Sequence, residues 1–168
     1  MAANRLDLVL SYVNTLKQDG ILATATRVDF YVLAATGPNN RLKFACRLTE
    51  KAYGLQHGVY AHTESQEEAA QLNELLWTFR QGSFIPHQLL SDNDADDDRT
   101  PVKIGTPDNA RTAGELLINL SSGAPAFATS YDRVAEIVDG GESSRQAGRE
   151  RYRQYRAMGL DPVTHNID

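Results

Sequence analysis

The chain of 168 residues has one cysteine, no long apolar run and no excess of positive charge. Cys46 alone cannot form an internal disulfide, and its apolar neighbours predict a buried thiol in a reducing cytosol. No segment approaches the roughly 20 apolar residues that cross a bilayer, and the first residues lack the pattern of an export signal. The sequence therefore predicts a cytoplasmic protein that does not enter a membrane.

The composition fits one globular domain, because 41% of the residues are hydrophobic and 23% are charged. A net charge of −5 argues against a protein that coats nucleic acid through its overall field. The charge is uneven, since residues 142–156 carry five arginines and two glutamates, a net of +3 that leaves −8 for the rest. This basic segment requires a local explanation.

Apolar patterning and turn residues predict alternating strands and helices. Asn39 or Asn40 is expected to cap the first helix, and Ser65 with Glu68 forms a capping box for the second. The expected strands are 28–33, 59–61, 102–104, 116–120 and 134–138, and the expected helices run from the asparagine cap to about residue 57, over 66–79 and over 142–158. This order is typical of α/β proteins with a mostly parallel sheet and helices on both faces.

Two segments lie outside this pattern. Residues 1–25 form an N-terminal extension ahead of the α/β domain of residues 26–168, and their apolar residues suit a short amphipathic helix. Ser91 to Arg99 contains five aspartates, which predicts a solvated loop. These aspartates lack the glycine and the closing glutamate of a calcium loop.

Motifs for nucleotide, metal and hydrolytic chemistry are missing. The turn after the first strand reads AATGPNN, with one glycine where a dinucleotide fingerprint needs three, and Glu67 and Glu68 put negative charge at the start of the next helix. The four histidines lack metal-ligand spacing. Ser121 and Ser122 do not fit G-x-S-x-G, and a helix-capping role is expected for them. We expect no catalytic residue, metal or cofactor.

The last helix carries the most distinctive pattern. At 100° per residue its basic side chains and one tyrosine share a face: Arg145, Arg149, Tyr152, Arg153 and Arg156. Arg151 points toward the sheet and requires either a partner there or an escape to solvent. Such a face suits an anionic peptide, because guanidinium groups grip carboxylates and the phenol ring offers apolar surface. A solvated helix face is the alternative. Trp77 lies off the apolar stripe of its own helix, which suits either a contact residue or partial burial under the following loop.

Two segments, LLWTFRQGSFIPH (75–87) and RQAGRERYRQYRAMGL (145–160), resemble the chi subunit of bacterial DNA polymerase III. The resemblance runs from about Arg27 to the C-terminus. It implies a Rossmann-like fold without catalysis of its own, which acts as an adaptor at the replication fork. In that family chi binds the psi subunit, which links it to the clamp loader, and the acidic C-terminal tail of the single-stranded DNA-binding protein. Contact with DNA is thus mainly indirect.

The resemblance also implies site residues. Family positions that hold the acidic tail match Arg145, Arg149, Tyr152 and Trp77, and Arg153 stands at a further basic position. We expect Arg145 and Arg149 to bind the tail's carboxylates, and Tyr152 with Trp77 to bind its last apolar side chains. No motif marks the psi-binding face. A nucleotide-using enzyme and a direct single-stranded DNA binder remain the competing functions, the first disfavoured by the missing glycine-rich loop and the second by the scarcity of stacking aromatics.

Overall fold

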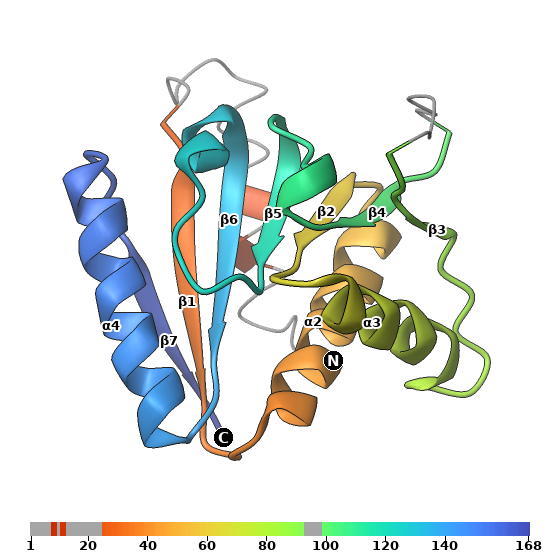
Figure 1. The fold of residues 1–168 in the computed structure, drawn as a ribbon, viewed down its shortest axis with the longest axis horizontal. Coiled ribbons are helices and arrows are strands. Elements are labelled where there is room, and N and C mark those ends of the chain that lie inside the picture. Colours follow the sequence, from red (N-terminus) through yellow and green to blue (C-terminus); the bar gives the residue numbers. More distant parts are fainter. Residues whose placement is uncertain (1–7, 10, 13–24, 93–98) are drawn as a thin grey trace.

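The computed structural model describes residues 8, 9, 11, 12, 25–92 and 99–168 (Figure 1). Its strands form one sheet in the order β3-β4-β2-β5-β6-β1-β7, and each neighbouring pair in it is parallel. The strands are β1 (Arg27–Leu33), β2 (Val59–His62), β3 (His87–Leu89), β4 (Val102–Gly105), β5 (Gly114–Asn119), β6 (Tyr131–Val138) and β7 (Val163–Ile167). The helices are α2 (Pro38–Gly54), α3 (Gln66–Thr78) and α4 (Glu142–Ala157).

Helices cover both faces of the sheet, as Figure 1 shows, with α2 and α3 on one side and α4 on the other. The predicted three-layer α/β fold with a parallel sheet is therefore confirmed. Parallel strands buried on both faces need apolar residues in succession rather than in alternation. The all-buried pattern of β2 meets that requirement.

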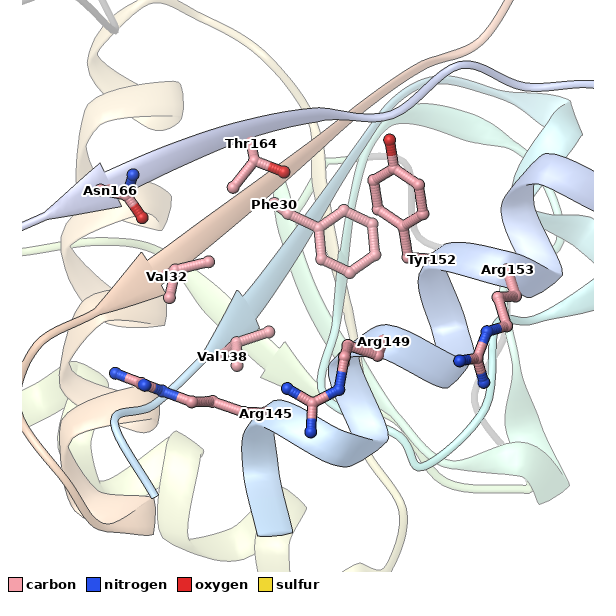
Figure 2. A pocket seen from close by; sticks show the side chains of 10 residues that line it. Phe30, Val32, Val138, Arg145, Arg149, Tyr152, Arg153, Thr164 and Asn166 are labelled. Atoms are coloured by element: carbon pink, nitrogen blue, oxygen red, sulfur yellow. The ribbon is translucent and has the colours of Figure 1, made fainter. Parts of the chain in front are cut away.

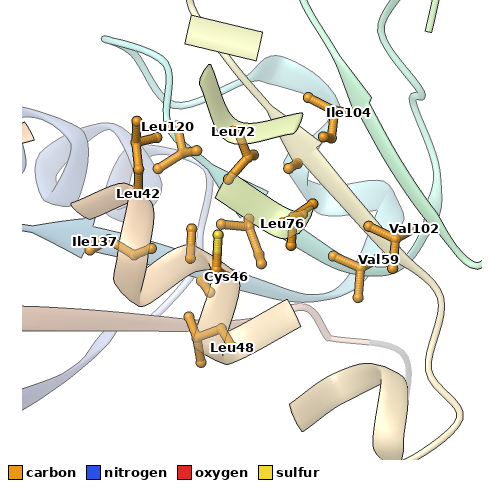
Figure 3. Close-up of a cluster of buried hydrophobic side chains, with 14 of the residues drawn as sticks. Leu42, Cys46, Leu48, Val59, Leu72, Leu76, Val102, Ile104, Leu120 and Ile137 are labelled. Atoms are coloured by element: carbon orange, nitrogen blue, oxygen red, sulfur yellow. The ribbon is translucent and has the colours of Figure 1, made fainter. Parts of the chain in front are cut away.

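The larger core lies between the sheet and the helices α2 and α3 (Figure 3). Leu42, Cys46 and Leu72 meet side chains of β2, β4 and β6 there, and each of the three is at most 4% exposed. Cys46 is fully buried, which confirms the predicted buried thiol, and this burial raises the pKa of the thiol to about 12. A second core lies under α4, where Tyr155 packs edge-on against Phe30 with ring centroids 5.9 Å apart.

The local signals at the two helix starts had different outcomes. Ser65 caps α3 as predicted and accepts a hydrogen bond from the Glu68 amide at 3.2 Å, although the Glu68 carboxylate reaches back to the Glu64 amide instead. The asparagine cap predicted for α2 is wrong, because Gly37 is the N-cap residue. Pro38 stands at the first helical position, where its fixed φ is preorganised, so the helix begins before the asparagines.

All five predicted strands are present, and β3 and β7 were missed. Most of the predicted N-terminal helix and of the aspartate-rich loop lies outside the described residues, although Leu8, Val9, Ser11 and Tyr12 are helical. Among the helices that the structure describes, none is long and apolar enough to span a bilayer.

Candidate functional site

A groove of about 530 Å³ lies between α4 and the edge strand β7 (Figure 2). Its lining comes from β1, β6, α4 and β7: Phe30, Val32, Val138, Arg145, Gly148, Arg149, Tyr152, Arg153, Thr164 and Asn166. Four of the five residues expected at a binding site thus lie together here. The fifth, Trp77, lies elsewhere.

Strand register forms the floor of this groove. Phe30 pairs with Thr164 and Val32 with Asn166, so these four side chains point to the α4 face of the sheet. The floor is therefore apolar along β1 and polar along β7. Gly148 brings α4 close to it, because a Cβ atom at this position would lie 2.7 Å from a methyl group of Val138.

Three arginines one turn apart form the helical wall of the groove. Arg149 donates from one nitrogen to the carboxylate of Glu142 at 2.9 Å and to the amide oxygen of Gln146 at 2.7 Å. Arg153 pairs with Glu150 at 3.1 Å. Among the described residues Arg145 has no ion-pair partner. The wall thus offers exposed guanidinium groups, and the carboxylates that pair with Arg149 and Arg153 are themselves exposed.

The other end of the groove is aromatic. Tyr152 is half-buried, and its ring lies 5.5 Å from the ring of Phe30. Its hydroxyl donates to the carbonyl of Pro162 at 3.4 Å, which connects α4 to the loop that leads into β7. Charge and apolar surface therefore occur side by side in one groove, and Figure 2 shows Phe30 and Tyr152 next to the row of arginines.

A buried polar network holds α4 in place. Glu136 on β6 is fully buried and accepts hydrogen bonds from Arg151 at 2.8 Å, Tyr155 at 2.6 Å and Asn119 at 2.6 Å. This is the partner that Arg151 requires on the sheet side of the helix. Burial and the neighbouring carboxylate together raise the pKa of Tyr155, so the phenol remains a donor. The network orients the helix so that Arg145, Arg149 and Arg153 face the groove.

A second buried cluster secures β7 to β1. The Asp29 carboxylate lies 2.7 Å from the His165 ring on β7, 2.9 Å from Arg133 on β6 and 3.1 Å from Arg27. Burial alone would raise the pKa of Asp29, but Arg133, Arg27 and His165 outweigh it and the pKa is lowered. Edge strand β7, and with it the floor of the groove, is thus held by its backbone pairing with β1 and by the contact of His165 with the Asp29 carboxylate.

Trp77 lies on α3, which packs against the opposite face of the sheet from α4. The indole is 57% exposed and its ring centroid lies 4.6 Å from that of His87. Phe84, in the loop between α3 and β3, is 81% exposed. Trp77 and Phe84 therefore each present apolar area to solvent, one from the end of α3 and the other from the loop that follows it. We call these two exposed side chains the aromatic surface.

The remaining polar candidates have structural surroundings. Ser121 donates to Asn119 at 2.6 Å in the loop after β5, and the next helical turn is capped by Pro125, so the predicted helix-capping role of the serine is wrong. His62 pairs with the Tyr60 hydroxyl at 2.8 Å. The described part of the chain brings no three metal-ligating side chains together.

Thr164, Asn166 and Phe30 were not recognised as groove residues from the sequence. Phe30 had been placed in the buried strand, and β7 itself was missed. The only signal in the sequence of Val163–Ile167 is that its two apolar residues, Val163 and Ile167, are separated by an even number of positions and therefore share one side of an extended chain. It is weak because five residues with two apolar positions do not distinguish an edge strand from a loop.

Comparison with known proteins identifies the relatives of this chain. A model of the family described as "DNA polymerase III chi subunit, HolC" matches residues 25–163. DNA polymerase III subunit chi of Pseudomonas aeruginosa is 39% identical over 142 residues, which cover 84% of this chain and 97% of the relative. The Haemophilus influenzae subunit chi is 29% identical over 146 residues, with 85% and 99% covered. The Escherichia coli subunit chi is 28% identical over 120 residues, with 71% and 80% covered.

Two solved structures share the fold at low identity. T4 UvsW superposes with a TM-score of 0.60 at 9% identity, over 87% of this chain and 42% of that one. Saccharomyces cerevisiae Dbp5 bound to RNA and ADP BeF3 superposes with a TM-score of 0.59 at 16% identity, over 99% and 50%. This chain spans about half of each or less, and the likeness concerns the fold alone.

Proposed function

Since this chain belongs to the DNA polymerase III chi subunit family, we propose that it serves the replicative polymerase as a non-catalytic adaptor with two binding surfaces. One surface is the groove between α4 and β7, which takes the acidic C-terminal tail of the single-stranded DNA-binding protein. The other is the aromatic surface, which takes the psi subunit and so reaches the clamp loader. The adaptor thereby couples the polymerase to coated template in the cytoplasm, at the replication fork.

The arrangement of the groove supports the first assignment. Arg145, Arg149 and Arg153 line one wall at helical spacing, while Phe30 and Val32 form an apolar floor within reach of the same ligand. An acidic peptide that ends in an apolar residue needs both features, because its carboxylates require guanidinium partners and its last side chain requires a dry surface. This combination is the observation that carries the proposal.

Arg149 already binds a carboxylate in this structure, at 2.9 Å from Glu142. A tail carboxylate can replace that partner without moving the backbone of α4. In our proposal Arg149 and Arg145 bind the terminal carboxylate and the aspartates of the tail. Tyr152 and Phe30 receive its last apolar side chain, and Arg153 adds attraction at the aromatic end of the groove.

Trp77 was expected to share the tail with Tyr152, and its position favours another role. It projects from α3, on the far side of the sheet from the groove. Exposed tryptophan and phenylalanine are typical anchors of protein interfaces. An adaptor that holds two partners at once also needs separated surfaces. We therefore assign Trp77, with Phe84, to the interface with psi.

A fluorescence titration tests both surfaces. A labelled acidic peptide that ends in phenylalanine should bind the wild type with a Kd on the micromolar scale, and binding should weaken as salt increases. Arg149→Ala should weaken binding at least tenfold, whereas Trp77→Ala should leave it unchanged. Arg156→Ala is the matched control, because it removes one arginine of α4 that does not line the groove.

Co-purification with psi should give the reverse pattern. Trp77→Ala should weaken psi binding about 30-fold or more, as expected for a hot-spot residue, and Arg149→Ala should not. Equal loss of the tail peptide in Trp77→Ala and Arg149→Ala would contradict the two-surface proposal. Tight salt-sensitive binding of a single-stranded oligonucleotide to the Arg149 face would favour direct DNA binding instead.

A further inference from the structure

A second basic groove lies on the other face of β7. Its volume is about 280 Å³, and it is lined by residues of β1, α2, β7 and the end of α3: Leu33, Ala34, Ala35, Asn40, Lys43, Phe44, Arg47, Phe79, Ile167 and Asp168. Lys43 and Arg47 stand one turn apart on α2. The guanidinium carbon of Arg47 lies 6.0 Å from the centroid of the Phe44 ring. We call this the α2 groove.

The cations of the α2 groove have no acidic partner in the described part of the chain. Lys43 and Arg47 are both exposed, and neither forms an ion pair. Asp168 also lines the groove without pairing with them. Lys43 and Arg47 therefore share the groove with Asp168 and with the aromatic side chain of Phe44. Like the α4 groove, the α2 groove combines cations with apolar surface, although it has two cations in place of three and an acidic residue in its lining.

The two grooves meet at the carboxyl ends of β1 and β7. Val32 and Asn166 face the α4 groove, and the next residues along each strand, Leu33 and Ile167, face the α2 groove. The Ala34 amide donates to the Ile167 carbonyl at 3.0 Å, so the two strand ends form one edge between the grooves. Arg145 extends past Val138 toward this edge (Figure 2).

We propose that the acidic partner chain continues from the α4 groove over this edge and places further carboxylates on Lys43 and Arg47. This inference rests on the proposed function, since it extends the same ligand. Layers of secondary structure pack about 10 Å apart, so crossing from one helix layer to the other takes roughly 20 Å, or about six extended residues. The ligand would then be a segment of about 12–15 residues with acidic groups at both ends of that span.

Three peptides with the same last five residues separate the possibilities. One is short, one extends to 15 residues with acidic side chains in the added part, and one has the same length with glutamine in their place. The wild type should bind the long acidic peptide about tenfold more tightly than the other two, because the second contact is intramolecular once the first has formed.

The double variant Lys43→Ala/Arg47→Ala should lose this tenfold gain and still bind the short peptide like the wild type. Both side chains are exposed, so folding should be preserved, which circular dichroism would verify. The matched control is Lys51→Ala/Arg80→Ala, which removes two cations from the same side of the sheet outside the groove.

The outcomes distinguish this inference from the proposed function. If the wild type does not bind the short peptide, the proposed tail site in the α4 groove is wrong. If the wild type binds the short peptide and the added acidic residues do not increase the affinity, only the proposal that the α2 groove binds the partner is wrong. That proposal is also wrong if the increase in affinity persists in Lys43→Ala/Arg47→Ala, or if the control variant loses it equally.

Discussion

The two faces of α4 carry the same kind of side chain in opposite surroundings. Arg151 has a side chain only 4% exposed, and it pairs with Glu136, which is fully buried, at 2.8 Å. Arg149, two residues earlier, is 51% exposed and pairs at 2.9 Å with Glu142, which is 81% exposed. The two ion pairs have nearly equal lengths. The two pairs differ in exposure to solvent, and the free energy needed to break each pair differs for that reason.

This difference shows which arginines are free to bind a partner. Separating a buried pair costs much free energy, because each charge would then lack both solvent and a counterion. An exposed pair contributes little and exchanges readily with water or with another carboxylate. Arg151 therefore stabilises the fold, and Arg149 is available to a ligand. Positive charge in the sequence of α4 does not by itself distinguish the two roles.

The largest expected effect is the loss of stability when an arginine on the buried side of α4 is replaced. Arg151→Ala should reduce the free energy of unfolding by about 3–5 kcal/mol, because Glu136 then remains buried without its cation. Arg153→Ala, on the exposed side, should change it by less than about 0.5 kcal/mol. Urea unfolding followed by circular dichroism measures both. Similar losses in the two variants would remove the distinction between the faces.

A second buried pair extends the comparison to β1. Asp29→Asn should lower the free energy of unfolding by about 2–3 kcal/mol at neutral pH, because the amide no longer neutralises Arg133. The loss is limited because the amide oxygen still accepts hydrogen bonds. The lowered pKa of Asp29 stabilises the folded protein fully above its ordinary value of 3.8, and this stabilisation is lost as the pH falls through the lower folded-state pKa. The stability gap between wild type and Asp29→Asn should therefore narrow below pH 3.8. A gap that is constant from pH 7 to pH 3 would contradict this account.

On the exposed side, the prediction concerns binding and not stability. Arg149→Lys keeps the charge but loses the planar fork, so the acidic peptide should bind about five- to tenfold more weakly. The unfolding free energy should stay within about 0.5 kcal/mol of the wild type. Parallel peptide titration and urea unfolding test the two statements. Full retention of affinity would mean that charge, and not geometry, governs the groove.

The smallest expected effect is on peptide affinity and comes from Glu142, which competes with the peptide for Arg149. Glu142→Gln removes the carboxylate that Arg149 now binds, so the acidic peptide should bind about twofold more tightly. Glu150→Gln, which frees Arg153 farther along the helix, is the comparison. Repeating the titration at high salt should abolish the gain, because salt screens an exposed pair. A weaker complex in Glu142→Gln would show that Glu142 positions Arg149 instead of competing for it.

Much of the fold followed from local patterns. Continuous apolar runs marked the buried strands, and the basic face of α4 was visible at helical spacing, with Tyr155 on its opposite side. Strand β7 was missed because an edge strand with polar side chains carries little periodic signal. The start of α2 was misplaced because the helix begins at Pro38, so that Asn39 and Asn40 already lie inside the helix and neither is its N-cap residue.

Only the helical part of the candidate site could be predicted from local patterns in the sequence. The arginines and Tyr152 belong to one helix, so their shared face follows from 3.6 residues per turn. Their floor does not, because Thr164 and Asn166 reach it through pairing with β1. Trp77 was grouped with them through family resemblance, and the layers of the fold place it across the sheet.

Preferences that act over a few residues were enough to predict the order of the elements, the α/β class and the basic face of α4. The pairing of Arg151 with Glu136, the strand that forms the groove floor and the side of the sheet on which Trp77 lies depend on the packing of distant segments. Asp29 and His165 are 136 residues apart in the chain and 2.7 Å apart in space. Such contacts depend on strand register and layer packing, which no local pattern specifies.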